Sequence, residues 1–172
     1  SLDIKTVLDF SIKDSNKKDK IEYCPIFNFN ALKPKMNFNH KESFCKERIF
    51  IINRKYLSIF GLPAYGVHCN VWSKFKNSTI IHLAKRSRKL DKFPGLYDNL
   101  IAGGQPIEIS IKENLYKEAY EEAGLTYELL HQATKSKTVH YIHNEGKKLN
   151  SAIIFIYHLQ KKKAMKFINL DG

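Results

Sequence analysis

The residues of this chain that are best suited to chemistry are three glutamates within residues 103–125. Glu118, Glu121 and Glu122 fall at positions i, i+3 and i+4, so a helix would carry their carboxylates on one face. Like charges at this spacing repel one another and destabilise an isolated helix. A bound divalent cation, Mg²⁺ or Mn²⁺, would turn that cost into a site, because hard cations prefer carboxylate oxygens.

The helix that carries these glutamates has sequence signals at both ends. Ser110 is a favourable N-cap residue, and Glu113 three positions later completes a capping box. Gly124 stands where a helix C-terminus favours a residue in the left-handed conformation. The sequence therefore predicts a helix that begins after Ser110 and ends before Gly124.

The acidic face of this helix is expected at the border of its buried face. Four residues follow a 4-3-4 spacing and so share one stripe: Ile111, Leu115, Glu118 and Glu122. The two apolar residues belong against a core, which holds the two glutamates beside it. A solvated helix whose charges have no function would place its glutamates opposite the apolar residues, so the stripe favours a site.

The same segment resembles the Nudix box. That pattern is a glycine, five residues, a glutamate, seven residues, and then Arg-Glu-apolar-any-Glu-Glu-any-Gly-apolar. Residues 117–125 match its core, with Gly103 at the expected distance upstream. The chain departs from it twice, because Lys117 replaces the arginine and Ile109 stands where the first glutamate belongs. Glu108 lies one position early, which turns its side chain elsewhere.

Further motifs resemble one branch of the Nudix superfamily. This branch is related to the Nudix domain fused to thiamine pyrophosphokinase in some fungi, and it includes plant plastid members. The likeness runs from about Arg48 to the C-terminus, and its motifs occur in the right order. The matching segments are Phe60-Gly61-Leu62, Tyr65-Gly66-Val67-His68, Arg86-Ser87, Phe93-Pro94-Gly95, residues 98–104, Ile109-Ser110 and Asn114-Leu115.

The resemblance implies an α/β protein with the Nudix fold, a mixed β-sheet in an α/β/α sandwich. It implies that the chain cleaves the phosphoanhydride of a small organic diphosphate with a water activated by Mg²⁺ or Mn²⁺. Glu118, Glu121 and Glu122 are the implied catalytic metal ligands, and Lys117 would orient Glu118 by its charge. The branch implies thiamine diphosphate or its oxidised analogues as the substrate.

Four residues are candidates for binding the substrate: Arg86, Arg88, Gly103 and Gly104. Arg86 lies in a matched motif and could hold the distal phosphate; for Arg88, a solvated basic loop is an equally good interpretation. Glycine is expected at 103 and 104 because the turn is tight and other atoms approach the backbone closely. His68 also matches the branch, but a histidine on a strand is more often structural.

The pattern of elements divides the chain into two regions. Residues 1–62 form an N-terminal extension with weak periodicity, in which we expect a short helix or strand at residues 4–10 and a helix near the end of residues 44–60. Residues 63–172 form the Nudix hydrolase domain. Its strands are expected at residues 65–71, 79–83, 100–102, 139–142 and 152–159.

The C-terminal end of the chain is short for the resembled branch. With 172 residues, the chain can bury a sizeable core as one domain, or as one domain with an appendage. In the branch, a segment similar to Asp171-Gly172 continues into a glutamate-containing strand and a final helix, which we expect to be missing here. Two explanations stay open: the sequence is part of a longer protein, or the protein is naturally short and inactive.

Composition limits the partners. The 29 basic and 17 acidic residues leave a formal net charge of +12, which attracts anions such as phosphorylated molecules. The lysines are scattered and do not alternate with aromatic residues, so nucleic acid is an alternative partner that the pattern does not favour. No apolar run is long enough to span a bilayer, and no membrane partner is expected. Three widely spaced cysteines and no secretory signal indicate a reduced, cytoplasmic protein of unspecified oligomeric state.

Two other functions stay open. A site of this kind could hydrolyse nucleoside diphosphate derivatives, which Nudix enzymes also accept. Alternatively, a catalytically inactive Nudix fold could bind RNA or a protein through its basic surface. Only an enzyme should require divalent metal and lose its activity when Glu121 or Glu122 is replaced by Gln, whereas RNA binding should depend strongly on salt.

Overall fold

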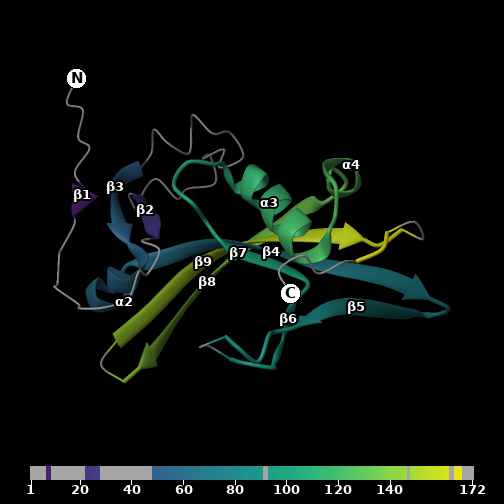
Figure 1. Ribbon diagram of the computed structural model, residues 1–172, viewed down its shortest axis with the longest axis horizontal. Helices are drawn as coiled ribbons and strands as arrows, with labels where there is room; N and C mark the ends of the chain where they lie inside the picture. The colour runs from purple at the N-terminus through teal and green to yellow at the C-terminus, as the bar shows by residue number, and fades with distance from the viewer. Residues whose placement is uncertain are drawn as a thin grey trace.

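The computed structural model describes residues 7–8, 22–27, 48–90, 93–146, 148–162 and 165–167. The N-terminal part of the described chain forms a small sheet in the order β1-β3-β2 (Figure 1). Its strands are β1 (Val7–Leu8), β2 (Tyr23–Phe27) and β3 (Arg48–Asn53). Strands β1 and β3 are parallel, and β2 and β3 are antiparallel. A 3₁₀ turn, η2 (Arg54–Tyr56), and a one-turn helix, α2 (Leu57–Phe60), lead from β3 to the larger sheet.

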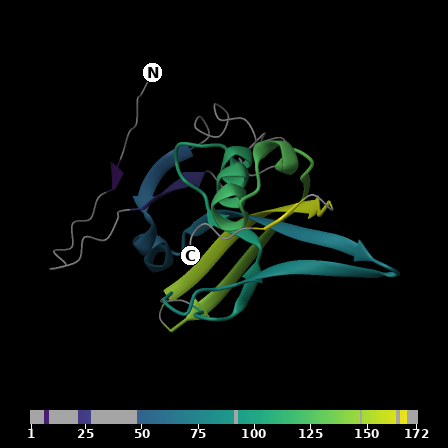
Figure 2. The ribbon, with the colours of Figure 1, turned by 45° about the vertical axis from the view of Figure 1, so that its right-hand side comes forward.

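The larger sheet has six strands: β4 (Pro63–Phe75), β5 (Ser78–Lys85), β6 (Tyr97–Asn99), β7 (Ile101–Gly104), β8 (Thr134–Glu145) and β9 (Lys148–Gln160). Their order is β6-β5-β4-β9-β8, and β7 pairs with β4 beside this path. Strands β4 and β9 run parallel, and the other pairs are antiparallel. The sheet is therefore mixed, as predicted. The β4–β5 and β8–β9 hairpins extend from it in different directions (Figure 2).

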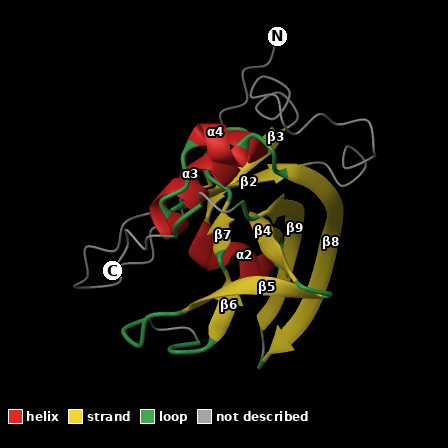
Figure 3. Cartoon of the chain, turned by 90° about the vertical axis from the view of Figure 1, so that its right-hand side faces the viewer, coloured by secondary structure: helices red, strands yellow, loops and turns green. Residues whose placement is uncertain are grey.

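A layer of two helices lies on one side of this sheet, as Figures 1 and 3 show. They are α3 (Ile111–Ala123) and α4 (Tyr127–Leu130). Alternate residues of β4 are buried, as the period-two pattern predicts: Tyr65, Val67, Cys69 and Val71. They share one core with Ile111 and Leu115 of α3. This core fixes α3 against the sheet and so determines where the acidic face of the helix lies.

The predicted strands of the larger sheet are confirmed, and several are longer than expected. The predicted helix near the end of residues 44–60 is confirmed as the single turn of α2, whereas Arg48–Asn53 in the same segment forms β3, which was not predicted. Apolar residues at this spacing do not distinguish a helix from a short buried strand, and here pairing with β1 and β2 decides the outcome. In the segment 4–10, Val7–Leu8 is a strand, and the other residues lie outside the described part.

None of the helices in the described residues is both long and apolar enough to cross a bilayer. The six-stranded sheet begins at Pro63, directly after the last residue that the sequence assigns to the N-terminal extension.

On the face of β5 that points away from the core, Ile81 and Leu83 are exposed. The described helices thus cover the face of the sheet that holds the predicted site.

Candidate active site

Helix α3 is held in place by contacts at both of its ends. Ser110 caps the N-terminus, because its Oγ accepts a hydrogen bond of 3.2 Å from Glu113 N–H. In return, Ser110 N–H donates to Glu113 Oε2 at 2.7 Å, which completes the capping box. Gly124 ends the helix in the left-handed conformation, with φ of 63°. All three predictions for the ends of this helix are confirmed.

Lys117 forms ion pairs with two of the three predicted metal ligands. Its ammonium group donates to Glu121 Oε2 at 2.6 Å and to Glu118 Oε1 at 3.1 Å. Glu118 is the more buried partner, with 12% of its side chain exposed against 40% for Glu121. Burial lowers the pKa of Lys117, but the bonds to the two carboxylates outweigh burial and raise it above its ordinary value. Lys117 is therefore a fixed cation between two carboxylates.

Glu122 connects the last turn of α3 to strand β7. Its Oε2 accepts a hydrogen bond of 2.7 Å from Ala102 N–H. Because this N–H points away from the pairing with β4, the carboxylate lies at the edge of β7 that faces α3. Asn114 makes a second connection to the same edge, since its Nδ2 donates to Gly104 O at 3.1 Å. Both ends of α3 are thus tied to the strand that carries the two glycines.

The two glycines are needed for close approach and not for a turn. Gly103 and Gly104 belong to β7, where they pair with Val67 and Gly66. Neither is among the described glycines with positive φ, so the expected tight turn is wrong. A Cβ atom on Gly103 would collide with the carboxylate of Glu118, and one on Gly104 would collide with a guanidinium group. The expectation that other atoms approach this backbone closely is confirmed.

That guanidinium belongs to Arg54, a residue that the sequence reasoning missed. Arg54 begins η2, directly after β3, and lies within the region assigned to the N-terminal extension. It belongs to none of the matched motifs, and a basic residue after an apolar run indicates no partner. Only the folded chain shows that the small sheet places a cation against Gly104.

Arg86 and Arg88 lie on the loop that joins β5 to β6. Arg86 Nη1 donates to Asp98 Oδ2 at 2.7 Å, and Arg88 lies against Gly95. Figures 1 and 3 show this loop on the other side of the sheet from α3. The structure therefore groups Lys117 and the glutamates with the two glycines and places the two arginines elsewhere. Their role in binding a phosphate stays a prediction.

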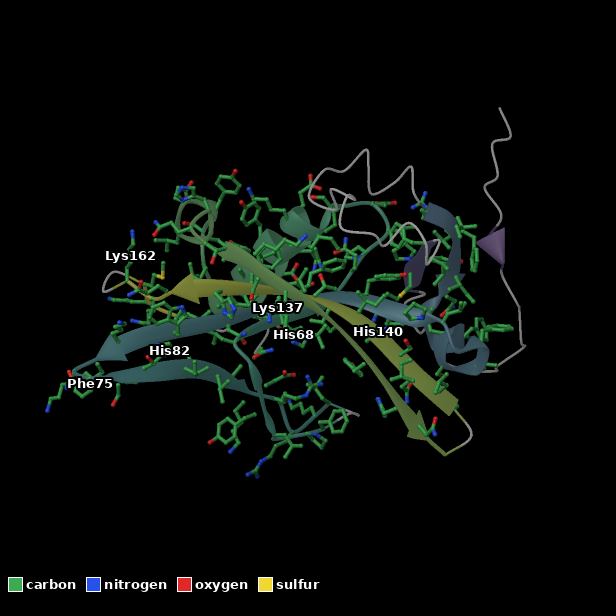
Figure 4. The ribbon with its side chains drawn as sticks, turned by 180° about the vertical axis from the view of Figure 1, so that it is seen from behind. His68, Phe75, His82, Lys137, His140 and Lys162 are labelled. Carbon is green, nitrogen blue, oxygen red and sulfur yellow. The ribbon has the colours of Figure 1, made fainter. Side chains whose placement is uncertain are left out.

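His68 lies on β4, on the side of the sheet away from α3 (Figure 4). Its Nδ1 lies 2.7 Å from Asn99 Nδ2, in hydrogen-bonding contact. Burial lowers the pKa of His68 below its ordinary value, although the charge of Asp98 opposes the shift. A half-buried, hydrogen-bonded histidine of this kind fits the structural role that its sequence context suggested.

The donor set of α3 fits a hard divalent cation in its chemistry. Carboxylate oxygens are the ligands that Mg²⁺ and Mn²⁺ prefer, and Glu118 and Glu121 already converge on one cation, the ammonium of Lys117. Within the described residues, no three acidic, cysteine or histidine side chains stand close enough together to ligate one ion as they are. Glu122 is turned toward Ala102, but a carboxylate can accept several bonds at once.

Comparison with known proteins gives a consistent assignment. No model of a protein family matches the chain. Among curated proteins, it is 33% identical to the chloroplastic Nudix hydrolase 24 of Arabidopsis thaliana over 132 residues, which cover 77% of this chain and 36% of that protein. For the chloroplastic Nudix hydrolase 20 of the same plant, the identity is 32% over 132 residues, and the shares are 77% and 35%. The chain thus spans about a third of the length of these relatives.

Among solved structures, the crystal structure of DR0079 from Deinococcus radiodurans matches with a TM-score of 0.53 and 14% identity. The match covers 87% of this chain and 78% of that one, and it supports the fold alone. The acidic helix, the glycine at position 103 that admits one of its carboxylates and the two plant relatives lead to one assignment. The chain belongs to the Nudix superfamily.

Proposed function

We propose that this chain is a hydrolase that cleaves the phosphoanhydride of a small organic diphosphate and releases phosphate. The observation that carries this proposal is the convergence of Glu118 and Glu121 on one cation, Lys117, on a helix that Glu122 ties to β7. Phosphoryl transfer depends on positioning and charge neutralisation more than on covalent help. A rigid acidic face beside a backbone that can be approached closely meets both needs.

Each residue of the site has a separate task in this proposal. A bound Mg²⁺ or Mn²⁺ would neutralise the diphosphate and lower the pKa of a water molecule. Glu118, Glu121 and Glu122 would hold that ion. Lys117 keeps Glu118 and Glu121 together by charge, without the two-pronged grip of an arginine. The hydrogen bond from Ala102 to Glu122 keeps the acidic face in register with β7.

Thiamine diphosphate and its oxidised analogues are the first substrates to test. This choice rests on the likeness of the motifs around β4, β7 and α3 to the thiamine-related branch. The two Arabidopsis relatives are named only as Nudix hydrolases. Nucleoside diphosphate derivatives are the second class, because the formal charge of +12 favours any phosphorylated molecule.

The decisive measurement is phosphate release from thiamine diphosphate, its oxidised analogues and a panel of nucleotides, with and without Mg²⁺. The wild type is compared with Glu122→Gln and with Glu128→Gln, which changes an exposed glutamate of α4. The glutamine at 122 can still accept the hydrogen bond from Ala102, so the fold should persist. We expect metal-dependent release by the wild type and Glu128→Gln, and a loss of about tenfold or more in Glu122→Gln.

No release from any diphosphate by a folded wild type would contradict the proposal. RNA binding that falls steeply with salt and ignores Glu121→Gln and Glu122→Gln would then favour an inactive binding fold with a basic surface. Release from nucleotides alone would keep the hydrolase and replace the thiamine substrate. Circular dichroism on every variant separates a loss of activity from a loss of structure.

A further inference from the structure

Arg54 is held between the two sheets by its backbone and its side chain. Its N–H donates to Glu22 O at 2.8 Å, at the start of the small sheet. Its guanidinium group lies against Gly104 of β7, where a Cβ atom would displace it. A charged side chain from the N-terminal extension therefore reaches the strand that also contacts the acidic helix. No matched motif assigns a role to this residue.

The guanidinium group of Arg54 is incompletely paired. Its Nε lies 2.9 Å from Glu22 Oε2, but this ion pair is not aligned as a hydrogen bond, and 59% of the Glu22 side chain is exposed. Both Nε and Nη2 are buried without a hydrogen-bond partner in the part of the chain that the structure describes. Unpaired N–H groups are costly when they are buried, and most of all on a charged side chain. Such a group indicates a missing acceptor.

The position of Arg54 relative to Glu118 suggests what that acceptor is. The carboxylate of Glu118 meets Gly103, and the guanidinium of Arg54 meets the next residue, Gly104. Successive positions of a strand face opposite sides, so the two groups flank β7 from its two sides. Positive charge would then lie on both sides of the two glycines. A metal held by the glutamates would supply it on one side, and Arg54 would supply it on the other.

We propose that Arg54 binds a phosphate group of the diphosphate substrate, and this rests on the proposed function of the site. A guanidinium group presents donors in a planar fork that matches phosphate oxygens in pairs. The Arg54 side chain as a whole is 31% exposed, although its Nε and Nη2 are buried, so a ligand would approach the guanidinium group through the exposed part of the side chain. The N-terminal extension is then part of the binding site and not only a support for it.

Arg54 is better suited to this role than Arg86, the residue that the sequence motif favoured. Arg86 donates to Asp98 at 2.7 Å in a well-formed ion pair, so its charge is already balanced. Glu22 is a weaker competitor for Arg54, because it is largely solvated and its ion pair is poorly aligned. A phosphate would replace a poor partner at Arg54, whereas it would have to displace a good one at Arg86.

The test is the affinity for inorganic pyrophosphate, measured by titration calorimetry in the presence of Ca²⁺, which also binds carboxylates. It compares the wild type with Arg54→Gln, Arg54→Lys and the control Arg48→Gln, which removes the cation at the other end of β3. Arg48 donates to Ile107 O and makes no contact with the glycines that the structure records. We expect Arg54→Gln to weaken binding about tenfold or more, Arg54→Lys to weaken it less, and Arg48→Gln to leave it unchanged.

Glu22→Gln makes the test independent of any damage to the fold. It removes the carboxylate that competes for Arg54, so pyrophosphate should bind more tightly than to the wild type. Equal affinity in the wild type and a folded Arg54→Gln would overturn the proposal. If Arg54→Gln does not fold, an unchanged affinity in Glu22→Gln overturns it instead, and so does a wild type that binds no pyrophosphate.

Hydrolysis assays separate this proposal from the proposed function. A wild type that binds pyrophosphate through Arg54 but releases no phosphate from any substrate would refute the hydrolase and leave the anion site standing. A hydrolase whose KM is the same in the wild type and Arg54→Gln would keep its activity assignment, and Arg54 would be a structural clamp on Gly104.

Discussion

The carboxylate of Glu118 occupies the space in which a side chain at Gly103 would lie. Strand β7 and helix α3 can approach this closely only because position 103 has no Cβ atom. Glu118 is thereby buried to all but 12% of its side chain, while Lys117 donates a hydrogen bond to its Oε1. One missing methyl group thus decides where the first carboxylate of the site stands.

We expect Gly103→Ala to reduce phosphate release about tenfold or more while the protein stays folded. The methyl group would push the Glu118 carboxylate aside, and a 1 Å displacement of a positioned group can cost far more in rate than in stability. Because the displaced atoms are the end of a flexible side chain, the free energy of unfolding should fall by only about 1 to 3 kcal/mol. Phosphate release measures the expected loss of activity, and urea unfolding of the same samples measures the expected change in the free energy of unfolding.

Gly66→Ala is the matched control for Gly103→Ala. Its Cβ atom would lie 2.9 Å from the backbone oxygen of Gly103, in the strand next to it. Backbone cannot move aside as a side chain can, so this variant should lose more stability than Gly103→Ala. Full activity in Gly103→Ala, or a larger loss of stability there than in Gly66→Ala, would contradict the account of the glycine pair.

The parts of the site that sequence could predict are those that depend on local contacts. Ser110, Glu113 and Gly124 act within a few residues of one another, so their types and spacing are enough to predict both ends of α3. The alternation along β4 likewise reports which side chains face the core. Sequence therefore predicted the acidic helix, its burial and the sheet on which it lies.

The parts that sequence could not predict depend on contacts between distant segments. Arg54 and Gly104 are 50 positions apart, and neither residue indicates the other. The strand at Arg48–Asn53 was not predicted, because its pairing partners lie far away in the chain. Of the two reasons predicted for the glycines at 103 and 104, the tight turn was wrong and the close approach of other atoms was right. The atoms that approach them come from α3 and η2, which are distant in the sequence.

Ser110→Ala should destabilise the protein by about 1 kcal/mol without changing the activity per folded molecule. The substitution removes the oxygen that accepts from Glu113 N–H and leaves one N–H group of the first helical turn without its cap. Urea unfolding gives the change in free energy, and phosphate release gives the activity. Adding Glu113→Ala should cost less in Ser110→Ala than in the wild type, because the box is then already broken. Strictly additive effects would refute the coupling.

Stability should fall between pH 7.5 and pH 5.5, in part through His68. Burial lowers the pKa of His68 in the folded state, so below about pH 6.5 the unfolded chain binds more protons than the folded one. The contribution of His68 is therefore complete above the unfolded pKa and is lost as the pH falls toward the folded pKa. Urea unfolding at the two pH values measures the difference.

His68→Gln should reduce this pH dependence. Glutamine does not titrate, so the variant should lose less stability than the wild type between pH 7.5 and pH 5.5. His140→Gln, at an exposed position of β8, is the control for a general effect of losing a histidine. The same pH dependence in His68→Gln and the wild type would show that this histidine does not titrate as its burial requires.

The buried thiols of Cys24 and Cys69 should be unreactive in the native protein. Both side chains are fully buried, and burial raises their pKa values to about 11 and about 12, although the charge of Arg54 opposes the shift at Cys24. At pH 8 neither thiol forms much thiolate, which is the species that attacks a disulfide reagent.

Since Cys45 lies outside the described residues, the experiment uses Cys45→Ser. Its reaction with Ellman's reagent should be slow until urea unfolds the chain, and then two thiols should react. Rapid reaction of one thiol in the native protein would mean that its sheet opens far below the unfolding transition, and Cys24→Ser would show whether the N-terminal sheet, with Arg54 beside it, is the part that opens.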